Sequence, residues 1–170
     1  DDKSLKLIRL ARSNAQRLLS MVDQLLDISR LQDFQPRASE PKNIQATCQF
    51  LLDSYRSLAE EKDIKLVLDS HIQADVTVDM LPDSLEKILS NLLTNAFKYS
   101  AGHQLITLKM ALNQQRQVVI SVSDTGMGIG EADQQNIFER FTRVENTTDY
   151  VPGAGIGLAL VKELVEQHKG

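Results

Sequence analysis

Residues 4–32 contain neither glycine nor proline, and apolar side chains recur along them at alternating spacings of three and four. The residues on this stripe are Ile8, Ala11, Ala15, Leu18, Val22 and Leu25. The spacing predicts one long helix with a coiled-coil-type seam. Leu19 and Leu26 widen the stripe, which favours packing in a helical bundle over a two-stranded zipper. Such a helix needs partner helices to cover its seam.

Composition narrows the class of protein. The chain has 170 residues, 42% hydrophobic and 25% charged, which is typical of a soluble globular domain with an appendage and excludes disordered and collagen-like chains. A net charge of -4 argues against nucleic acid as a partner held along the whole surface. No apolar run reaches the roughly 18 residues that a bilayer span needs, so we expect no direct membrane contact. The single cysteine, Cys48, predicts a reducing, cytoplasmic setting.

A change in pattern follows the long helix. Residues 34–42 carry two prolines and predict a hinge or an edge strand, where we place a domain boundary. Residues 43–61 have the pattern of one amphipathic helix. Short alternating runs at 64–68 and 75–78 predict two strands joined as a hairpin.

The second half of the chain alternates helical and strand-like segments. We expect a helix from Pro82 to about Ser100, followed by an antiparallel hairpin of residues 104–112 and 117–123. Two further helices are predicted at 131–140 and 156–169. Between them, residues 141–155 have the composition of a surface loop.

Six of the eight glycines fall within residues 126–157. The first cluster follows an apolar strand that ends at Asp124, so a carboxylate stands beside backbone that a flat ligand could approach. The second cluster leads into a helix, whose free N–H groups favour phosphate oxygens. A flexible hinge with helix-entry glycines is the alternative interpretation of this second cluster.

Polar side chains also gather on the helix at 82–100. Asn91, Asn95 and Lys98 lie within a stripe of roughly 60°, and Tyr99 follows. An Asn amide oxygen can complete the shell of a Mg²⁺ ion held by phosphates, and a lysine can neutralise phosphate charge. A solvated helix face is the alternative.

Four segments, in this order, resemble the ATP-binding domain of sensor histidine kinases, within the superfamily of gyrase, heat-shock chaperone and mismatch-repair ATPases. Residues 91–100 (NLLTNAFKYS) are similar to the N box, and residues 124–129 (DTGMGI) to the first glycine box. Residues 137–141 (IFERF) resemble the F box, and residues 153–160 (GAGIGLAL) the second glycine box. Upstream, residues 15–31 resemble the second helix of the dimerisation and phosphotransfer bundle.

The resemblance implies an α+β two-layer sandwich, in which a mixed, mostly antiparallel sheet packs against about three helices and one long bundle helix precedes it. Residues 1–33 would be the second bundle helix, residues 34–42 a linker and residues 43–170 the ATP-binding domain. We expect the first bundle helix and the family's final strands to lie outside this chain.

The resemblance also implies ATP and Mg²⁺ as cofactors. Asp124 would accept a hydrogen bond from the adenine amine, Asn95 would coordinate Mg²⁺, and Asn91 would support the metal and phosphate region. Residues 142–152 would form a lid over the triphosphate. The other residues that the resemblance places at the nucleotide are Lys98, Tyr99, Gly126, Gly128, Ile129, Phe138, Phe141, Gly153, Gly155, Ile156, Gly157 and Leu158. Ordinary core packing is the alternative for the two phenylalanines.

By the same resemblance, the γ-phosphoryl group passes to a histidine on the first bundle helix. His71, His103 and His168 lie elsewhere and lack the family's acceptor motif, so we expect no catalytic residue within this chain. The implied partners are that His-bearing helix, a second protomer in a homodimer, and a response-regulator receiver domain. Gyrase-like members have a water-activating Glu at position 91, whereas Asn91 cannot take a proton near neutral pH, so direct hydrolysis should be slow.

Three alternatives stay open from the sequence. The first is a stand-alone Ser/Thr kinase or regulator of the anti-sigma type, which the helix at 4–32 disfavours. The second is a conformation-switching ATPase, which Asn91 disfavours. The third is a degenerate dimerisation and docking module, which would have no affinity for nucleotide.

Overall fold

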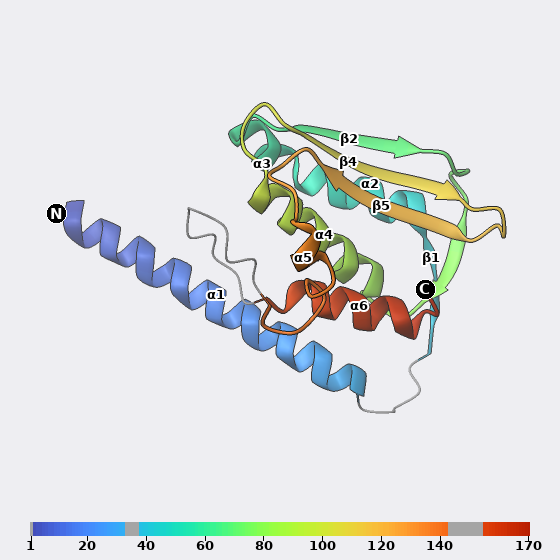
Figure 1. Ribbon diagram of the computed structural model, residues 1–170, viewed down its shortest axis with the longest axis horizontal. Helices are drawn as coiled ribbons and strands as arrows, with labels where there is room; N and C mark the ends of the chain where they lie inside the picture. The colour runs from blue at the N-terminus through green and yellow to red at the C-terminus, as the bar shows by residue number, and fades with distance from the viewer. Residues whose placement is uncertain (1, 33–37, 143–154) are drawn as a thin grey trace.

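The computed structural model describes residues 2–32, 38–142 and 155–170. Figure 1 shows the arrangement of the elements. In chain order they are α1 (Asp2–Gln32), β1 (Glu40–Asn43), α2 (Ile44–Ser54), α3 (Arg56–Glu61), β2 (Lys65–Ser70), β3 (Thr77–Met80), α4 (Ser84–Tyr99), β4 (Leu105–Leu112), β5 (Val118–Asp124), α5 (Glu131–Gln134) and α6 (Gly157–Gln167). The long N-terminal helix, the helix that ends near Ser100 and the β4–β5 hairpin are confirmed.

The main sheet has the strand order β2-β4-β5, with β2 parallel to β4 and β4 antiparallel to β5. Helices α2, α3 and α4 lie against one of its faces (Figure 1). Along β4, Ile106, Leu108 and Met110 are fully buried while the residues between them face outward, the alternation of a sheet covered on one side. The predicted two-layer α+β sandwich is therefore confirmed, and two of the three pairings among the described strands are antiparallel.

The predicted hairpin of residues 64–68 and 75–78 is wrong. Both segments are strands, but β3 pairs antiparallel with β1, from Glu40 opposite Met80 to Asn43 opposite Thr77. β2 pairs with β4 instead, from Lys65 opposite Leu105 to Ser70 opposite Met110. Parallel strands need a long crossover, which α4 supplies. Period-two alternation indicates which face of a strand is buried, but it does not determine with which strand it pairs.

The single helix predicted at 43–61 is two helices. Asn43 caps α2 by accepting a hydrogen bond from the Ala46 N–H at 2.8 Å. At its other end the Ser54 hydroxyl donates to the Leu51 carbonyl at 2.6 Å, so a side chain takes an acceptor that a continuing helix would use. The Tyr55 ring, between α2 and α3, stacks on Phe97 of α4 with centroids 5.5 Å apart. The break between α2 and α3 therefore falls at Tyr55, whose ring packs against α4.

The helix predicted at 131–140 is also wrong beyond its first turn. α5 ends at Gln134, and turns with bonds from Asn136 N–H to Asp133 O and from Glu139 N–H to Asn136 O follow it. Ile137 and Phe138 both line the same cavity. These two side chains reach the cavity from the turns that follow α5 and not from a continued helix.

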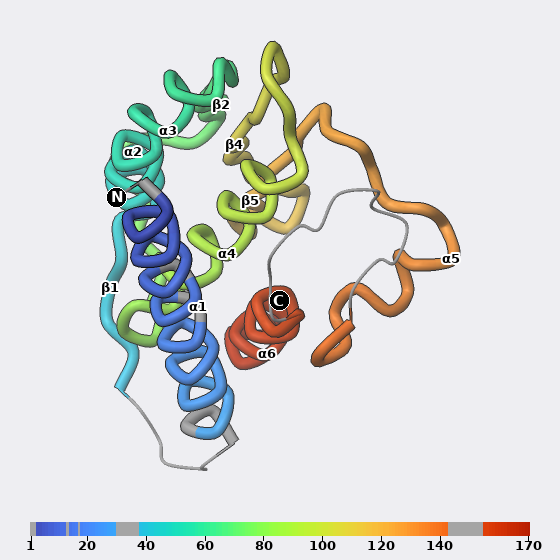
Figure 2. The backbone as a smooth tube through the Cα atoms, turned by 90° about the vertical axis from the view of Figure 1, so that its left-hand side faces the viewer, coloured from blue at the N-terminus to red at the C-terminus, as the bar shows by residue number. Residues whose placement is uncertain are grey.

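Two clusters of buried side chains hold the molecule together. The larger one lies between the main sheet and α2, α3 and α4, and contains Cys48, Leu93 and Phe97. The smaller one joins α1, α4 and α6 through Ile28, Ile88 and Leu160, among others. Figure 2 shows α1 and α6 side by side.

Most of α1 makes no such contact. Its N-terminal half extends beyond the other elements (Figure 1), and Leu18 on the predicted seam and Leu19 beside it are 63% and 65% exposed. The seam therefore faces away from the smaller cluster, which α1 enters with Ile28. Among the described residues, no helix combines the length and the hydrophobicity needed to cross a bilayer.

Candidate functional site

A cavity of about 300 Å³ lies between α4, the end of β5, the segment after it and the start of α6. This volume is at the lower end of the range for small-molecule sites. Its lining residues are Leu92, Asn95, Ala96, Tyr99, Val122, Asp124, Met127, Gly128, Ile129, Ile137, Phe138, Thr142 and Leu158. The lining is mostly apolar, with a carboxylate and an amide as its strongest polar groups.

One face of α4 forms the floor of this cavity. Leu92, Asn95, Ala96 and Tyr99 recur at i, i+3, i+4 and i+7, which brings their side chains to one side of the helix. Because residues advance by about 100°, Asn91 and Lys98 lie on the adjoining stripe and do not line the cavity. Of the predicted polar stripe, Asn95 alone reaches it.

Asp124 ends β5, opposite Ile106 at the start of β4. Its Oδ1 accepts a hydrogen bond from the Gly126 N–H at 2.9 Å, which fixes the orientation of the carboxylate. Within the described residues its other oxygen has no partner. Asp124 can therefore accept one strong hydrogen bond from a donor in the cavity.

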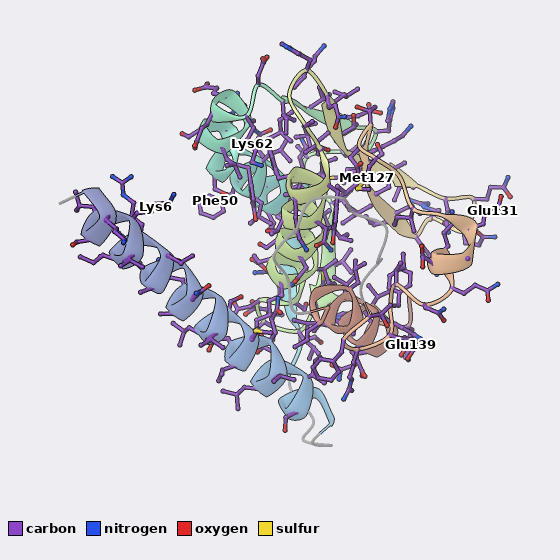
Figure 3. The ribbon with its side chains drawn as sticks, turned by 60° about the vertical axis from the view of Figure 1, so that its left-hand side comes forward. Lys6, Phe50, Lys62, Met127, Glu131 and Glu139 are labelled. Carbon is purple, nitrogen blue, oxygen red and sulfur yellow. The ribbon has the colours of Figure 1, made fainter. Side chains whose placement is uncertain are left out.

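The turn after Asp124 is tied to the strand and the helix beside it. The Thr125 N–H donates to the Leu105 carbonyl at 3.1 Å, and the Met127 N–H donates to the Tyr99 carbonyl at 3.4 Å. Gly126 lies so close to the Tyr99 carbonyl that a Cβ there would collide with it. Figure 3 shows Met127 near the C-terminal end of α4.

Lys98 adds a positive charge beside the cavity, where its side chain contacts Tyr99. The Lys98 ammonium donates to the Tyr99 hydroxyl at 3.0 Å and lies 4.6 Å from the centroid of its ring. Within the part of the chain that the structure describes, no carboxylate pairs with this ammonium. It remains able to neutralise an anionic group of a ligand that extends past Tyr99.

Asn91 faces α1 rather than the cavity. Its Oδ1 accepts from Gln24 Nε2 at 3.0 Å, and its Nδ2 donates to the Lys87 carbonyl at 2.7 Å. A Cβ at Gly157 would lie 2.6 Å from the same Oδ1, so the amide sits at the junction of α1, α4 and α6. The structure thus separates Asn91 from Asn95.

The segment between Glu131 and Glu139, which Figure 3 marks by these two residues, lies between β5 and α6 in the chain and lines the cavity with Ile137 and Phe138. Phe138 lines the cavity, whereas Phe141 is 64% exposed and does not. The Phe141 N–H donates to the Gly155 carbonyl at 2.7 Å, which joins the chain on either side of residues 143–154. Gly153 and most of the predicted lid at 142–152 lie outside the described residues.

Seven predicted site residues line the cavity together: Asn95, Tyr99, Asp124, Gly128, Ile129, Phe138 and Leu158. Gly126 and Gly155 shape its walls without lining it, and Ile156 is buried with Ile28 instead. The lining residues that the sequence prediction missed are Leu92, Ala96, Val122, Met127, Ile137 and Thr142. Helical spacing from Asn95 would have found Leu92 and Ala96. Met127 and Ile137 stand within the first glycine box and the F box, and Thr142 opens the predicted lid. No local pattern singles out Val122.

The donor set limits how a metal could bind here. The described residues contain no cluster of three or more His, Cys, Asp or Glu side chains that could hold an ion by themselves. Mg²⁺ commonly keeps several waters and takes only one or two protein ligands when phosphates supply the rest. The amide of Asn95 fits that role, and a protein cage for a metal does not exist in this part of the chain.

Comparison with known proteins identifies relatives. Residues 80–170 match the family described as histidine kinase-, DNA gyrase B-, and HSP90-like ATPases. The chain is 31% identical to the sensor histidine kinase TmoS of Ectopseudomonas mendocina over 97% of its own length and 17% of that protein. It is 35% identical to the autoinducer 2 sensor kinase/phosphatase LuxQ of Vibrio cholerae over its whole length and 20% of that protein. It therefore spans about a fifth of these curated relatives.

Solved structures agree with the fold. Full-length ShkA in complex with AMPPNP superposes with a TM-score of 0.75 at 27% identity, over 91% of this chain and 32% of that one. The mycobacterial sensor histidine kinase MprB superposes with a TM-score of 0.68 at 25% identity, over 76% of this chain and 82% of that one.

Proposed function

The chain belongs to the family of histidine kinase-, DNA gyrase B- and HSP90-like ATPases, and we propose that it is the part of a two-component sensor histidine kinase that binds Mg-ATP and donates its γ-phosphoryl group to a histidine. One observation carries this proposal. The Asp124 carboxylate and the Asn95 amide converge on one apolar cavity, whose wall is built by glycine-containing turns. An apolar slot with one oriented acceptor suits a flat base with an exocyclic amine.

In this proposal different residues bind the adenine base and the metal with its phosphates. The free oxygen of Asp124 binds the adenine amine, while the apolar side chains of the lining, among them Leu92, Met127 and Ile129, exclude water from the base. Asn95 holds Mg²⁺, and Lys98 neutralises the phosphates near Tyr99. The bound metal and nucleotide supply the electrophilic phosphorus and the charge screening that phosphoryl transfer requires.

The acceptor and the partners belong to the proposal as well. We assign residues 1–33 to the second helix of the bundle, residues 34–42 to a linker and residues 43–170 to the ATP-binding domain. A His-bearing bundle helix and a second protomer would cover the exposed seam of α1, and a receiver domain would take the phosphoryl group afterwards. We place the chain in the cytoplasm, where ATP is supplied.

Calorimetric titration with AMP-PNP, in the presence and absence of Mg²⁺, tests the cofactor part. We expect one-to-one binding that Mg²⁺ strengthens, and we expect Asn95→Ala to remove most of the strengthening. Asn14→Ala, at an exposed position of α1, is the matched control and should behave as the wild type. A folded chain that binds no nucleotide under either condition would contradict the proposal.

Radiolabel transfer tests the kinase part. Incubated alone with γ-labelled ATP, the chain should retain no phosphohistidine, because its three histidines lie outside α1. Addition of a His-bearing bundle helix from a relative should produce acid-labile label on that helix. Label on a serine or threonine would favour the anti-sigma type of kinase instead.

A further inference from the structure

One side of α1 contacts Asn91 of α4, a residue that the sequence resemblance places near the nucleotide. Gln24, Asp27 and Ile28 recur on α1 at i, i+3 and i+4, so they share one side of the helix. This side packs on α4 and α6, whereas the exposed seam of α1 points elsewhere. A bundle partner on the seam can therefore coexist with the contact that α1 makes with α4 and α6.

The polar part of this contact involves one turn of α4. Asp27 Oδ1 lies 2.6 Å from the Lys87 ammonium, and Gln24 Nε2 donates to Asn91 Oδ1 at 3.0 Å. The Lys87 carbonyl in turn accepts from Asn91 Nδ2 at 2.7 Å. Both ends of the Asn91 amide are thus engaged, one of them by α1.

Engagement of Asn91 has a consequence for the cavity. Its amide does not line the cavity in this arrangement, whereas Asn95, one turn further along α4, does. To reach a phosphate or a metal beside Asn95, the Asn91 side chain must rotate and give up its hydrogen bonds to Gln24 and to Lys87. Nucleotide binding through Asn91 and docking of Gln24 then exclude one another.

We infer that Gln24 of α1 competes with Mg-ATP for the Asn91 amide, so that the docked position of α1 lowers the nucleotide affinity of the cavity. The inference rests on the proposed function, together with the expectation from the resemblance that Asn91 supports the metal and phosphate region, and it adds a means of regulating nucleotide binding. A displacement of the bundle helix that withdraws Gln24 raises nucleotide affinity. By linkage, bound nucleotide weakens the docking of α1 by the same factor.

The absence of a side chain at Gly157 makes space for the hydrogen bond between Gln24 and Asn91. It opens α6 at the junction, where an added Cβ would lie 2.6 Å from Asn91 Oδ1 and 3.8 Å from Gln24 Nε2. Any larger residue would press on the amide in its docked position. A glycine here lets the Asn91 side chain occupy the space beside α1.

The test measures AMP-PNP affinity in the presence of Mg²⁺ by calorimetry on the whole chain. Gln24→Ala should bind roughly three- to ten-fold tighter than the wild type, the effect of losing one competing hydrogen bond. Gln16→Ala, at an exposed position of the same helix, is the matched control and should leave the affinity unchanged. Thermal unfolding of each variant establishes that it is folded.

The same substitution made in the Asn91→Ala variant tests whether the effect of Gln24 depends on Asn91. In Asn91→Ala the competing amide is absent, so adding Gln24→Ala should change the affinity no further. An equal gain in both backgrounds would overturn the inference, as would wild-type or weaker affinity of Gln24→Ala. If neither the wild type nor Gln24→Ala binds AMP-PNP, the proposed function fails and the inference fails with it. Wild-type binding without a gain in Gln24→Ala overturns the inference alone.

Discussion

The Gly155 carbonyl accepts a hydrogen bond from the Phe141 N–H at 2.7 Å, and both residues have a positive φ, +68° and +66°. Residues 142 and 155 lie so close that a Cβ on Gly155 would be 2.6 Å from the Thr142 carbonyl. This contact closes the chain beside the cavity, between its Phe138 wall and the start of α6. The second glycine cluster therefore serves a backbone contact as well as any ligand.

Gly155→Ala should destabilise this closure. A left-handed conformation costs an alanine about 1–2 kcal/mol, and the contact with Thr142 adds to that. We expect a lower free energy of unfolding in urea and weaker binding of AMP-PNP. Gly130→Ala is the control, since Gly130 has φ -60° and its added Cβ would meet nothing closer than 3.5 Å. Equal stability of the two variants would contradict this account.

His168 should stabilise the junction of α6 with α4. Its Nε2 accepts from the Leu81 N–H at 3.0 Å, and its Nδ1 lies 2.6 Å from the Leu164 carbonyl. His168→Ala leaves the Leu81 N–H without this acceptor, so it should lower the free energy of unfolding by about 1–2 kcal/mol. The same change at His71, whose side chain is 59% exposed, should have a much smaller effect in the same urea titration. Equal effects would show that the His168 contact stabilises nothing.

Cys48 should make stability depend on alkaline pH. Burial raises the pKa of its thiol from 9.0 to about 12, so the folded state keeps the thiol neutral where the unfolded chain ionises it. The contribution is therefore complete below pH 9 and is lost as pH rises toward 12. The difference in unfolding free energy between wild type and Cys48→Ala, measured from pH 8 to pH 11, should shrink as pH rises.

A thiol reagent gives an independent check on Cys48. The fully buried thiol should react with Ellman's reagent at pH 8 only as fast as the chain unfolds, and rapidly in denaturing urea. Fast reaction of the native chain would contradict the burial.

Hydrolysis of ATP by the chain alone should be very slow. By the resemblance, gyrase-like members carry their water-activating Glu at the position of Asn91, and an amide cannot accept a proton near neutral pH. We expect phosphate release no greater than that of Asp124→Asn, measured by a coupled phosphate assay. Turnover clearly above this variant would favour the conformation-switching ATPase that the sequence left open.

Local periodicity was sufficient to predict α4 and the β4–β5 hairpin, because each buries a face that its own sequence defines. It also predicted α1, although the apolar stripe of that helix is exposed. It could not give the partner of β2, since Leu66 and Leu68 would be buried equally well in a hairpin or beside β4. It also overextended α5, which ends at Gln134 and is followed by turns.

In the candidate site, too, the local sequence pattern predicts some features and tertiary contacts determine the others. Asp124 and Gly128 follow from a strand that runs into glycines, and the structure places both on the cavity. The orientation of Asn91 depends on Gln24, 67 residues away in sequence, and no local pattern carries that information. Tertiary contacts thus decide which polar side chain of α4 faces the cavity.

The proposed nucleotide site depends on Asp124, so calorimetry of Asp124→Asn is the decisive measurement. The substitution keeps the shape of the side chain but replaces a charged acceptor by an amide. We predict one-to-one binding of AMP-PNP with Mg²⁺ by the wild type and by Asp79→Asn, an exposed control on β3. Asp124→Asn should bind about 10- to 150-fold more weakly, the effect of one hydrogen bond to a charged group. Equal affinity of Asp124→Asn and the wild type, with both folded, would contradict the account.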